Sequence, residues 1–202
     1  MVKEQITREL EDNLGLNHGF FESLLEEDDW AFVIKLHAFV DAACSELLLY
    51  HFKEPNLETT LTQIELGNIK TGKIVFLSKL GLITPEHKRA IQELSKLRNS
   101  FAHNVRDAHA TLKGKFEKLD KQQKNNFLNA FPKEGAIAVR LMRNYHDFKK
   151  VPEIDPERIV EELNKEFDLK LQIWSSVLGL LIHFTDIKGF CDMRQQDKIR
   201  NT

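Results

Sequence analysis

Cysteine is scarce in this chain of 202 residues: only Cys44 and Cys191 occur, too few and too far apart for a disulfide framework. This scarcity favours a reducing compartment, and we expect a cytoplasmic protein. Long apolar runs are also missing, because the longest, from Ile173 to Phe184, spans about a dozen residues and includes two serines, too short to cross a bilayer. The first five residues carry no apolar core of a signal peptide, so we expect no membrane partner.

Proline and glycine are few as well, with five and nine residues respectively, which leaves little room for long flexible linkers. Hydrophobic residues make up 42% and charged residues 30% of the chain, which is ordinary for a soluble globular protein. The length suits one domain with a real core. We expect a single domain over residues 1–187, followed by a polar tail over residues 188–202.

Charge is distributed unevenly along the chain. Residues 1–60 contain thirteen acidic and four basic side chains, a net charge of −9, whereas residues 98–150 contain twelve basic and five acidic side chains, a net charge of +7. A local positive field of this kind attracts polyanions. A solvated basic helix that pairs with an acidic neighbour would give the same pattern, so both interpretations stay open.

The apolar residues recur at helical spacing nearly throughout, and no strand pattern of useful length is present. In the segment from Trp30 to Phe52 the residues at three- and four-residue steps are Trp30, Val33, Ile34, Ala38, Val40, Cys44, Leu47, Leu48 and Phe52. The pattern predicts an all-α protein, with further helices over 73–80, from 85 to about 103 and from 155 to about 187. Segment 109–131 is helical but polar, so we expect it outside the main core, within a basic insert at about 105–150.

The most informative motif lies at the end of the helix expected from Pro85. There Arg98, Asn99 and His103 combine a permanent cation, an amide and a group that titrates near neutrality. An imidazole exchanges protons with a ribose 2′-OH or a leaving oxygen, and a guanidinium fork matches a phosphate. On a straight helix Arg98 and His103 lie ~140° apart, so either the helix ends near Ala102 or two chains each supply part of one cleft.

The arrangement Arg-x4-His, with Asn after the Arg and Ala before the His, resembles the signature of the HEPN superfamily. The stretch from Gly67 to His103, including Leu80-Gly81-Leu82-Ile83, is also similar to the mannitol operon repressor family. Both resemblances imply an all-α helical bundle. The HEPN resemblance implies a metal-independent endoribonuclease that forms a homodimer and needs no cofactor, often controlled by an antitoxin or another regulatory protein.

Under that resemblance each residue of the motif has an implied role. His103 would be the general acid and base, Arg98 would stabilise charge on the phosphate, and Asn99 would position the substrate or the histidine. Glu46, on an earlier helix, is a candidate to hold Arg98 in place. Candidate RNA-binding residues follow in the basic segment: Arg106, Arg140, Arg143, Tyr145 and Lys149.

Two alternatives stay open. The likeness to the mannitol operon repressor implies a non-catalytic transcriptional regulator that acts through protein contacts. The motif can also be structural, with Arg98 paired to an acid inside the bundle and His103 bonded to the last carbonyls of its helix. The sequence contains no recognisable helix-turn-helix pattern, which argues against direct sequence-specific DNA binding.

Two further patterns invite over-interpretation. Residues Gly67–Lys73 match the first seven places of a phosphate-binding loop, but the eighth is Ile74 instead of Ser or Thr. We interpret this segment as the turn that introduces the next helix. Eight histidines are present, but none stands at His-x3-His spacing, and we expect no metal site. His37 and His183 lie on apolar helices and are predicted to be hydrogen-bonded core residues.

Overall fold

The computed structural model describes residues 8, 11–12, 14–102, 109–132 and 168–200, with side chains to residue 189. Within these residues the regular structure is entirely helical and contains no strand, which confirms the expected all-α class. Of the helices in this part of the chain, none combines the length and the apolar character needed to cross a membrane.

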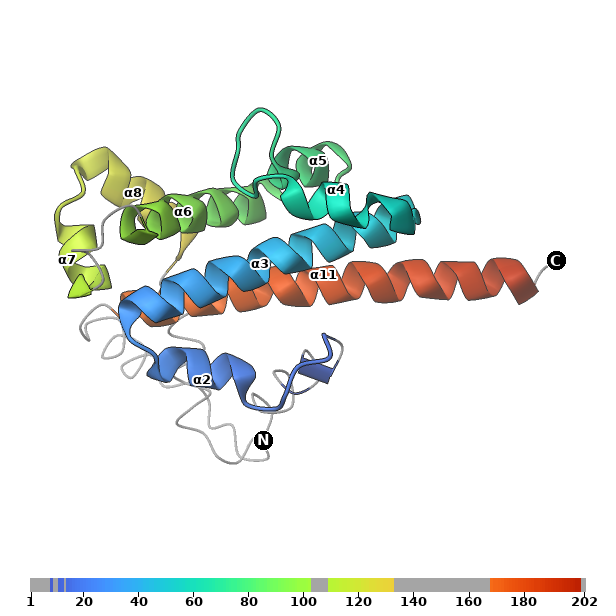
Figure 1. Ribbon diagram of the computed structural model, residues 1–202, viewed down its shortest axis with the longest axis horizontal. Helices are drawn as coiled ribbons and strands as arrows, with labels where there is room; N and C mark the ends of the chain where they lie inside the picture. The colour runs from blue at the N-terminus through green and yellow to red at the C-terminus, as the bar shows by residue number, and fades with distance from the viewer. Residues whose placement is uncertain (1–7, 9–10, 13, 103–108, 133–167, 201–202) are drawn as a thin grey trace, which may run out of the picture.

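Three long helices form the centre of the molecule (Figure 1): α3 (Asp29–Phe52), α6 (Pro85–Ala102) and α11 (Leu169–Arg200). Helices α3 and α11 run in the same direction, because Lys170 pairs with Asp29 at 3.1 Å near their starts and Lys188 pairs with Glu46 at 2.9 Å further along. Helix α6 packs against both and runs the opposite way (Figure 1). The chain just before α6 lies beside the middle of α11, where His183 Nε2 and the Leu82 carbonyl oxygen are 3.1 Å apart.

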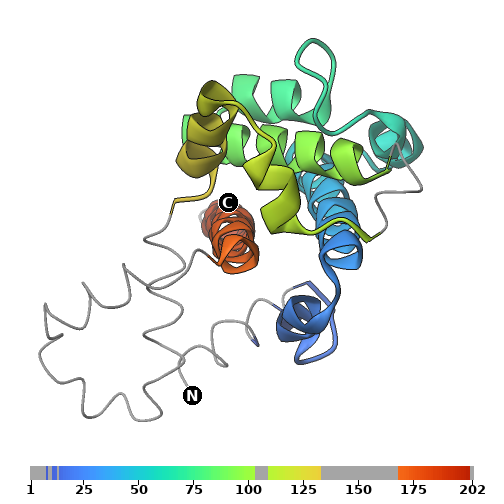
Figure 2. The same cartoon turned by 90° about the vertical axis from the view of Figure 1, so that its left-hand side faces the viewer.

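Shorter helices cover this central group. They are α2 (Phe20–Glu26), a 3₁₀ turn (Pro55–Leu57), α4 (Glu58–Gln63), α5 (Lys73–Lys79), α7 (Leu112–Glu117) and α8 (Lys121–Ala130). In Figure 2, where α3 and α11 are viewed nearly end-on, α2 lies on one side of the pair and α6, α7 and α8 lie on the other.

The helix boundaries follow from local side-chain and backbone chemistry. The Asp28 side chain caps α3 by accepting a hydrogen bond from the Ala31 amide at 2.8 Å. Lys53 ends that helix in the left-handed conformation, at φ 55°, ahead of Pro55. Gly81 adopts φ 69° directly after the C-cap of α5, so the predicted helix stop at this glycine is confirmed.

One continuous hydrophobic cluster joins the helices. At one end Trp174 of α11 is fully buried, and its Nε1 donates to the carbonyl of Phe21 in α2 at 2.8 Å. The buried Glu11 carboxylate accepts from the amides of Gly19 and Phe21 at 2.9 and 3.1 Å, which fixes the entry to α2. The chain therefore closes its N-terminal side against α11 through hydrogen bonds as well as apolar contacts.

Two expectations about the organisation are corrected. Segment 109–131 does not lie outside the core, because four of its apolar side chains are buried in the main cluster: Leu112, Phe127, Ala130 and Phe131. The helical spacing of these apolar residues is hard to recognise in the sequence, because many Lys, Gln and Asn residues that face solvent lie between them. Residues 188–200 are not a separate tail, since α11 continues to Arg200. The expected helix start at 155–157 lies outside the described residues, as do residues 105–108 and 133–150 of the basic segment.

Candidate functional site

The C-terminal end of α6 carries the first two residues of the motif. Both Arg98 and Asn99 are half-buried, and the Arg98 guanidinium donates through Nη1 to Asn99 Oδ1 at 3.0 Å. Among the described residues this is the hydrogen bond that the guanidinium makes, and its other N–H groups have no described partner. Asn99 therefore orients the arginine, whereas the role expected for it, positioning the substrate or His103, stays a prediction. His103 lies just beyond Ala102, outside the described residues.

Arg98 has no ion pair with any carboxylate in the described part of the chain. Its charge is nevertheless felt nearby, because the pKa of His37 on α3 is lowered, first by burial and next by the positive charge of Arg98. His37 is consequently a neutral imidazole at pH 7. The structural alternative, in which Arg98 pairs with an acid, is not seen among the described residues.

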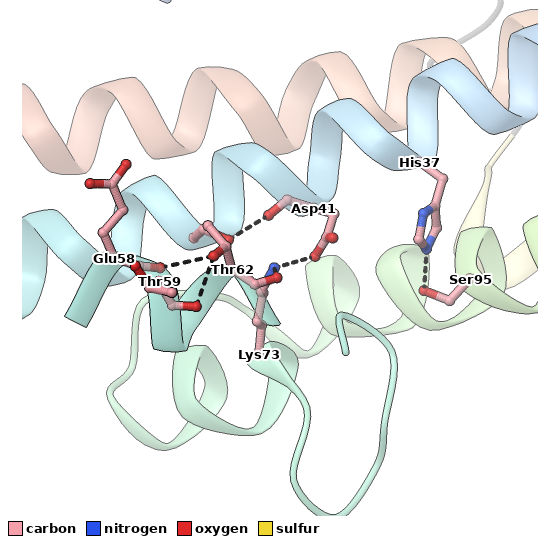
Figure 3. A network of polar contacts seen from close by, with 8 residues as sticks. His37, Asp41, Glu58, Thr59, Thr62, Lys73 and Ser95 are labelled. Atoms are coloured by element: carbon pink, nitrogen blue, oxygen red, sulfur yellow. Dashed lines mark hydrogen bonds and ion pairs between the residues drawn. The ribbon is translucent and has the colours of Figure 1, made fainter. Parts of the chain in front are cut away.

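A polar seam runs between α3, α5 and α6 beside Arg98; we define it by His37, Asp41, Lys73 and Ser95 (Figure 3). His37 Nε2 and Ser95 Oγ lie 3.2 Å apart, and one helical turn further along α3 the Asp41 carboxylate accepts from Lys73 Nζ at 2.6 Å. Lys73 is only 1% exposed, while Asp41 is 34% exposed. Except for Arg98 at its edge, the seam thus satisfies its own charges and hydrogen bonds.

The loop that resembled a phosphate-binding loop is part of this seam. Asn68 Oδ1 accepts from the amides of Lys70 and Thr71 at 2.9 and 3.1 Å, which folds residues 67–72 into a tight turn before α5. The lysine of the pattern, Lys73, is buried against Asp41 instead of facing solvent. The interpretation of this segment as a helix-introducing turn is confirmed.

Two glycines let the loop pack this closely. A Cβ at Gly72 would lie 2.5 Å from the Asn68 carbonyl oxygen, and a Cβ at Gly67 would lie 2.6 Å from Ser95 on α6. The turn is therefore pressed against the helix that carries the motif. Gly67 and Ser95 together set the position of the hydroxyl that His37 contacts.

Glu46 does not have the role expected of it. Its carboxylate is 60% exposed and accepts from Lys188 Nζ of α11 at 2.9 Å, so it links α3 to α11 instead of holding Arg98. The expectation was wrong because it took the helix of Glu46 into account but not the face on which the residue lies. The residue of α3 whose pKa responds to Arg98 is His37, about two and a half turns nearer the start of the helix than Glu46.

The remaining candidate residues are not placed. The general acid and base and the proposed RNA-binding residues lie outside the described residues: His103, Arg106, Arg140, Arg143, Tyr145 and Lys149. Of the expected site, the structure brings together Arg98 and Asn99 and shows their surroundings.

Sequence reasoning missed the polar seam as a unit. A usable signal was present, since His37 and Asp41 stand four residues apart on a largely apolar helix and so share one face. The prediction that His37 is a hydrogen-bonded core residue is confirmed, and so is that for His183, whose Nε2 lies 3.1 Å from the Leu82 carbonyl oxygen. Among the described residues no group of three or more metal-binding side chains converges.

Comparisons with models of protein families, with curated proteins and with solved structures found no match.

Proposed function

We propose that this protein is a metal-independent endoribonuclease of the HEPN type, in which Arg98 binds the scissile phosphate and His103 transfers protons. The observation that carries the proposal is the state of Arg98: a half-buried guanidinium, oriented by Asn99 at 3.0 Å, without a carboxylate partner among the described residues. Holding a partly desolvated cation without a counterion costs free energy, and an anionic ligand offsets that cost. A phosphate diester is such a ligand, and it accepts hydrogen bonds from the free side of the guanidinium fork.

The reaction proposed is an intramolecular transesterification. The 2′-oxygen of the ribose attacks the adjacent phosphorus and loses its proton to a neutral imidazole, while the bond from phosphorus to the 5′-oxygen breaks. The departing 5′-oxygen takes a proton from an imidazolium. The products are a 2′,3′-cyclic phosphate and a 5′-hydroxyl, and Arg98 stabilises the negative charge that develops on the phosphoryl oxygens.

A homodimer supplies the two imidazoles that this reaction needs. If α6 continues as a regular helix to His103, Arg98 and His103 point ~140° apart and one chain alone does not direct both at one phosphate. Two copies of α6 that meet near a two-fold axis bring one His103 as base and the other as acid. The oligomeric state measured by light scattering tests this part of the proposal separately.

The function is tested by incubating end-labelled RNA with the protein in EDTA. Wild type is expected to produce cyclic-phosphate ends, while Arg98→Ala and His103→Ala lose activity by at least about a hundredfold, in the range of general acid–base and electrostatic contributions. Arg89→Ala is the matched control, because Arg89 is an exposed arginine on the same helix that pairs with Glu86, at 2.8 Å. Circular dichroism verifies that each variant is folded.

An inactive wild type would contradict the proposal, as would Arg98→Ala activity equal to that of Arg89→Ala. A protein that binds no RNA and cuts none, yet retains its fold, favours the second candidate function, a non-catalytic regulator that acts through a protein partner. The presence of an antitoxin or another controlling partner is then addressed by co-purification from the native source.

A further inference from the structure

A cavity of about 410 Å³ lies on the other side of α6, between α6, α7 and α8. We refer to it as the α6–α8 groove. Most of its surface is hydrocarbon, contributed by Leu97, Leu112, Phe116, Leu119 and Phe127. The volume falls within the roughly 300–1,000 Å³ that small-molecule sites occupy. Leu97, Phe116 and Leu119 are only half-buried, so the structure leaves an apolar surface open here.

The walls of the groove are held by specific contacts. Thr111 Oγ1 caps α7 by accepting from the Gly114 amide at 3.0 Å, and Asp120 caps α8 in a reciprocal pair with Gln123. The rings of Phe116 and Phe127 meet edge to face, with centroids 5.2 Å apart. The Leu112 amide donates to Asp29 Oδ2 at 2.7 Å, which ties α7 to the start of α3. The groove is therefore formed before any ligand arrives.

The polar side chains that line the groove are nearly all donors. The oxygens of Gln123 and Asn126 are used, since Gln123 Oε1 accepts from the Asp120 amide and Asn126 Oδ1 accepts from Gln122, each at 3.0 Å. Their NH₂ groups donate to no other described residue. Lys118 is exposed and forms no ion pair with a described carboxylate.

The charge of the lining is positive. It contains three lysines and a single carboxylate, Glu93, which is already paired with Lys96. Lys115 Nζ donates to the Ser100 carbonyl at 2.6 Å and lies 5.1 Å from the centre of the Phe101 ring, so it faces the α6 side. This leaves Lys118, with the amides of α8, as the donors best suited to an anionic head group.

We propose that the α6–α8 groove binds a small molecule with an apolar body and one carboxylate. The apolar body lies on Leu97, Phe116 and Phe127, and the carboxylate accepts hydrogen bonds from Lys118 Nζ and the amide NH₂ groups. This inference is independent of the proposed nuclease, because the groove uses Leu97 and Ser100 of α6 whereas Arg98 acts on His37 of α3. The two sites occupy different faces of the same helix.

The test is isothermal titration of the full chain with decanoate, below its micelle concentration. Wild type is expected to bind one molecule per chain saturably. Lys118→Gln is expected to weaken binding by about tenfold, the loss of one hydrogen bond to a charged group. Lys79→Gln is the control, because Lys79 is exposed on α5, away from the groove. Decanol, which has the same body without the charge, is expected to bind more weakly than decanoate by a similar factor.

Several results would overturn the proposal. No saturable binding of decanoate by folded wild type does so directly. Equal affinity of Lys118→Gln and Lys79→Gln, or of decanoate and decanol, contradicts the carboxylate site. Leu97→Asp places a negative charge on the apolar wall and is expected to abolish binding; if binding survives in this variant while circular dichroism is unchanged, decanoate binds elsewhere.

Discussion

Lys73 and Arg98 are two cations at the same helical seam, and they are treated in opposite ways. Lys73 is 1% exposed and its ammonium meets the Asp41 carboxylate at 2.6 Å. Arg98 is half-buried and its guanidinium meets a neutral amide, that of Asn99, at 3.0 Å. At the Lys73 end of the seam, which we call the closed end, the positive charge is balanced by Asp41. At the Arg98 end, which we call the open end, no described carboxylate balances the positive charge.

This difference separates structure from recognition. A buried charge with its own counterion holds elements together, here α3 and α5, and has little left to offer a ligand. A charge oriented by a neutral neighbour keeps its field, and that field reaches His37. The loop that resembled a nucleotide-binding motif belongs to the first kind, and the motif at the end of α6 belongs to the second.

Removing the counterion of Lys73 should break the closed end with the largest effect. Asp41→Ala leaves an ammonium buried without a partner and is expected to destabilise the protein by roughly 3 kcal/mol, the low end for such pairs because Asp41 is partly exposed. Urea denaturation measures this loss. The double variant Asp41→Leu with Lys73→Met removes both charges and should recover a large part of it. If the single variant loses less than about 1 kcal/mol, the pair is not what closes the seam.

The turn that delivers Lys73 should be nearly as sensitive. Gly72→Ala places a Cβ 2.5 Å from the Asn68 carbonyl oxygen, a backbone atom that has no easy way to move, and is expected to cost about 2 kcal/mol. Gly179→Ala on α11 is the control, since a Cβ there meets nothing within 4 Å and a helical alanine is favoured over glycine. In thermal unfolding, Gly72→Ala should have a lower Tm than wild type, and Gly179→Ala should have the same Tm or a higher one.

The open end of the seam should make stability depend on pH. The pKa of His37 is lowered below 6.5 in the folded state, so the unfolded chain binds more protons just below that pH. Stability is therefore full above pH 6.5 and falls as the pH drops through 6.5 toward the folded pKa. His87, whose pKa is also lowered by burial, adds to the same loss. Urea midpoints from pH 7.5 to 5 should fall less steeply in His37→Gln than in wild type; equal slopes would contradict this.

Arg98→Ala should have the smallest effect on stability, and it tests the difference between Arg98 and Lys73 most directly. Arg98→Ala removes a cation that lowers the pKa of His37, so that pKa should rise toward its ordinary value while burial keeps it from reaching it. Stability should change by less than about 1 kcal/mol, in contrast to Asp41→Ala. Nuclear magnetic resonance titration of the His37 ring measures the shift, with Arg89→Ala as the control that leaves it unchanged. No difference between the two variants would mean that the charge of Arg98 does not reach the imidazole.

The sequence was sufficient for the elements whose ends are marked by local chemistry. Asp28, Gly81 and the pair Thr84-Pro85 set helix boundaries through caps that act within a few residues, and the helices that they bound lie within one residue of the expected ranges. The burial of segment 109–131 was not predicted. Its apolar residues are spread among lysines and amides, and only the packing of α7 and α8 on α6 reveals that they share one side.

The candidate site also contains contacts that the sequence makes predictable and contacts that it does not. Adjacency in sequence makes the contact between Arg98 and Asn99 predictable, and helical spacing keeps it on one helix. The seam depends on contacts between residues far apart, such as His37 with Ser95 and Asp41 with Lys73, and such pairings follow from the register of α3 against α5 and α6. The wrong partner chosen for Glu46 has the same origin, since its true partner, Lys188, is more than a hundred residues away.

The hydrogen bond from Trp174 to Phe21 lets tryptophan fluorescence report on the contact between α11 and α2. Trp174 is buried against α2, whereas the other tryptophan, Trp30, is 38% exposed at the start of α3. The first indole should emit at short wavelength and resist iodide, and the second should emit at longer wavelength and be quenched. In a Trp30→Phe variant the tryptophan fluorescence would come from Trp174 alone, at the contact between α2 and α11. A red shift of that emission would report local loosening of this contact separately from unfolding of the whole bundle.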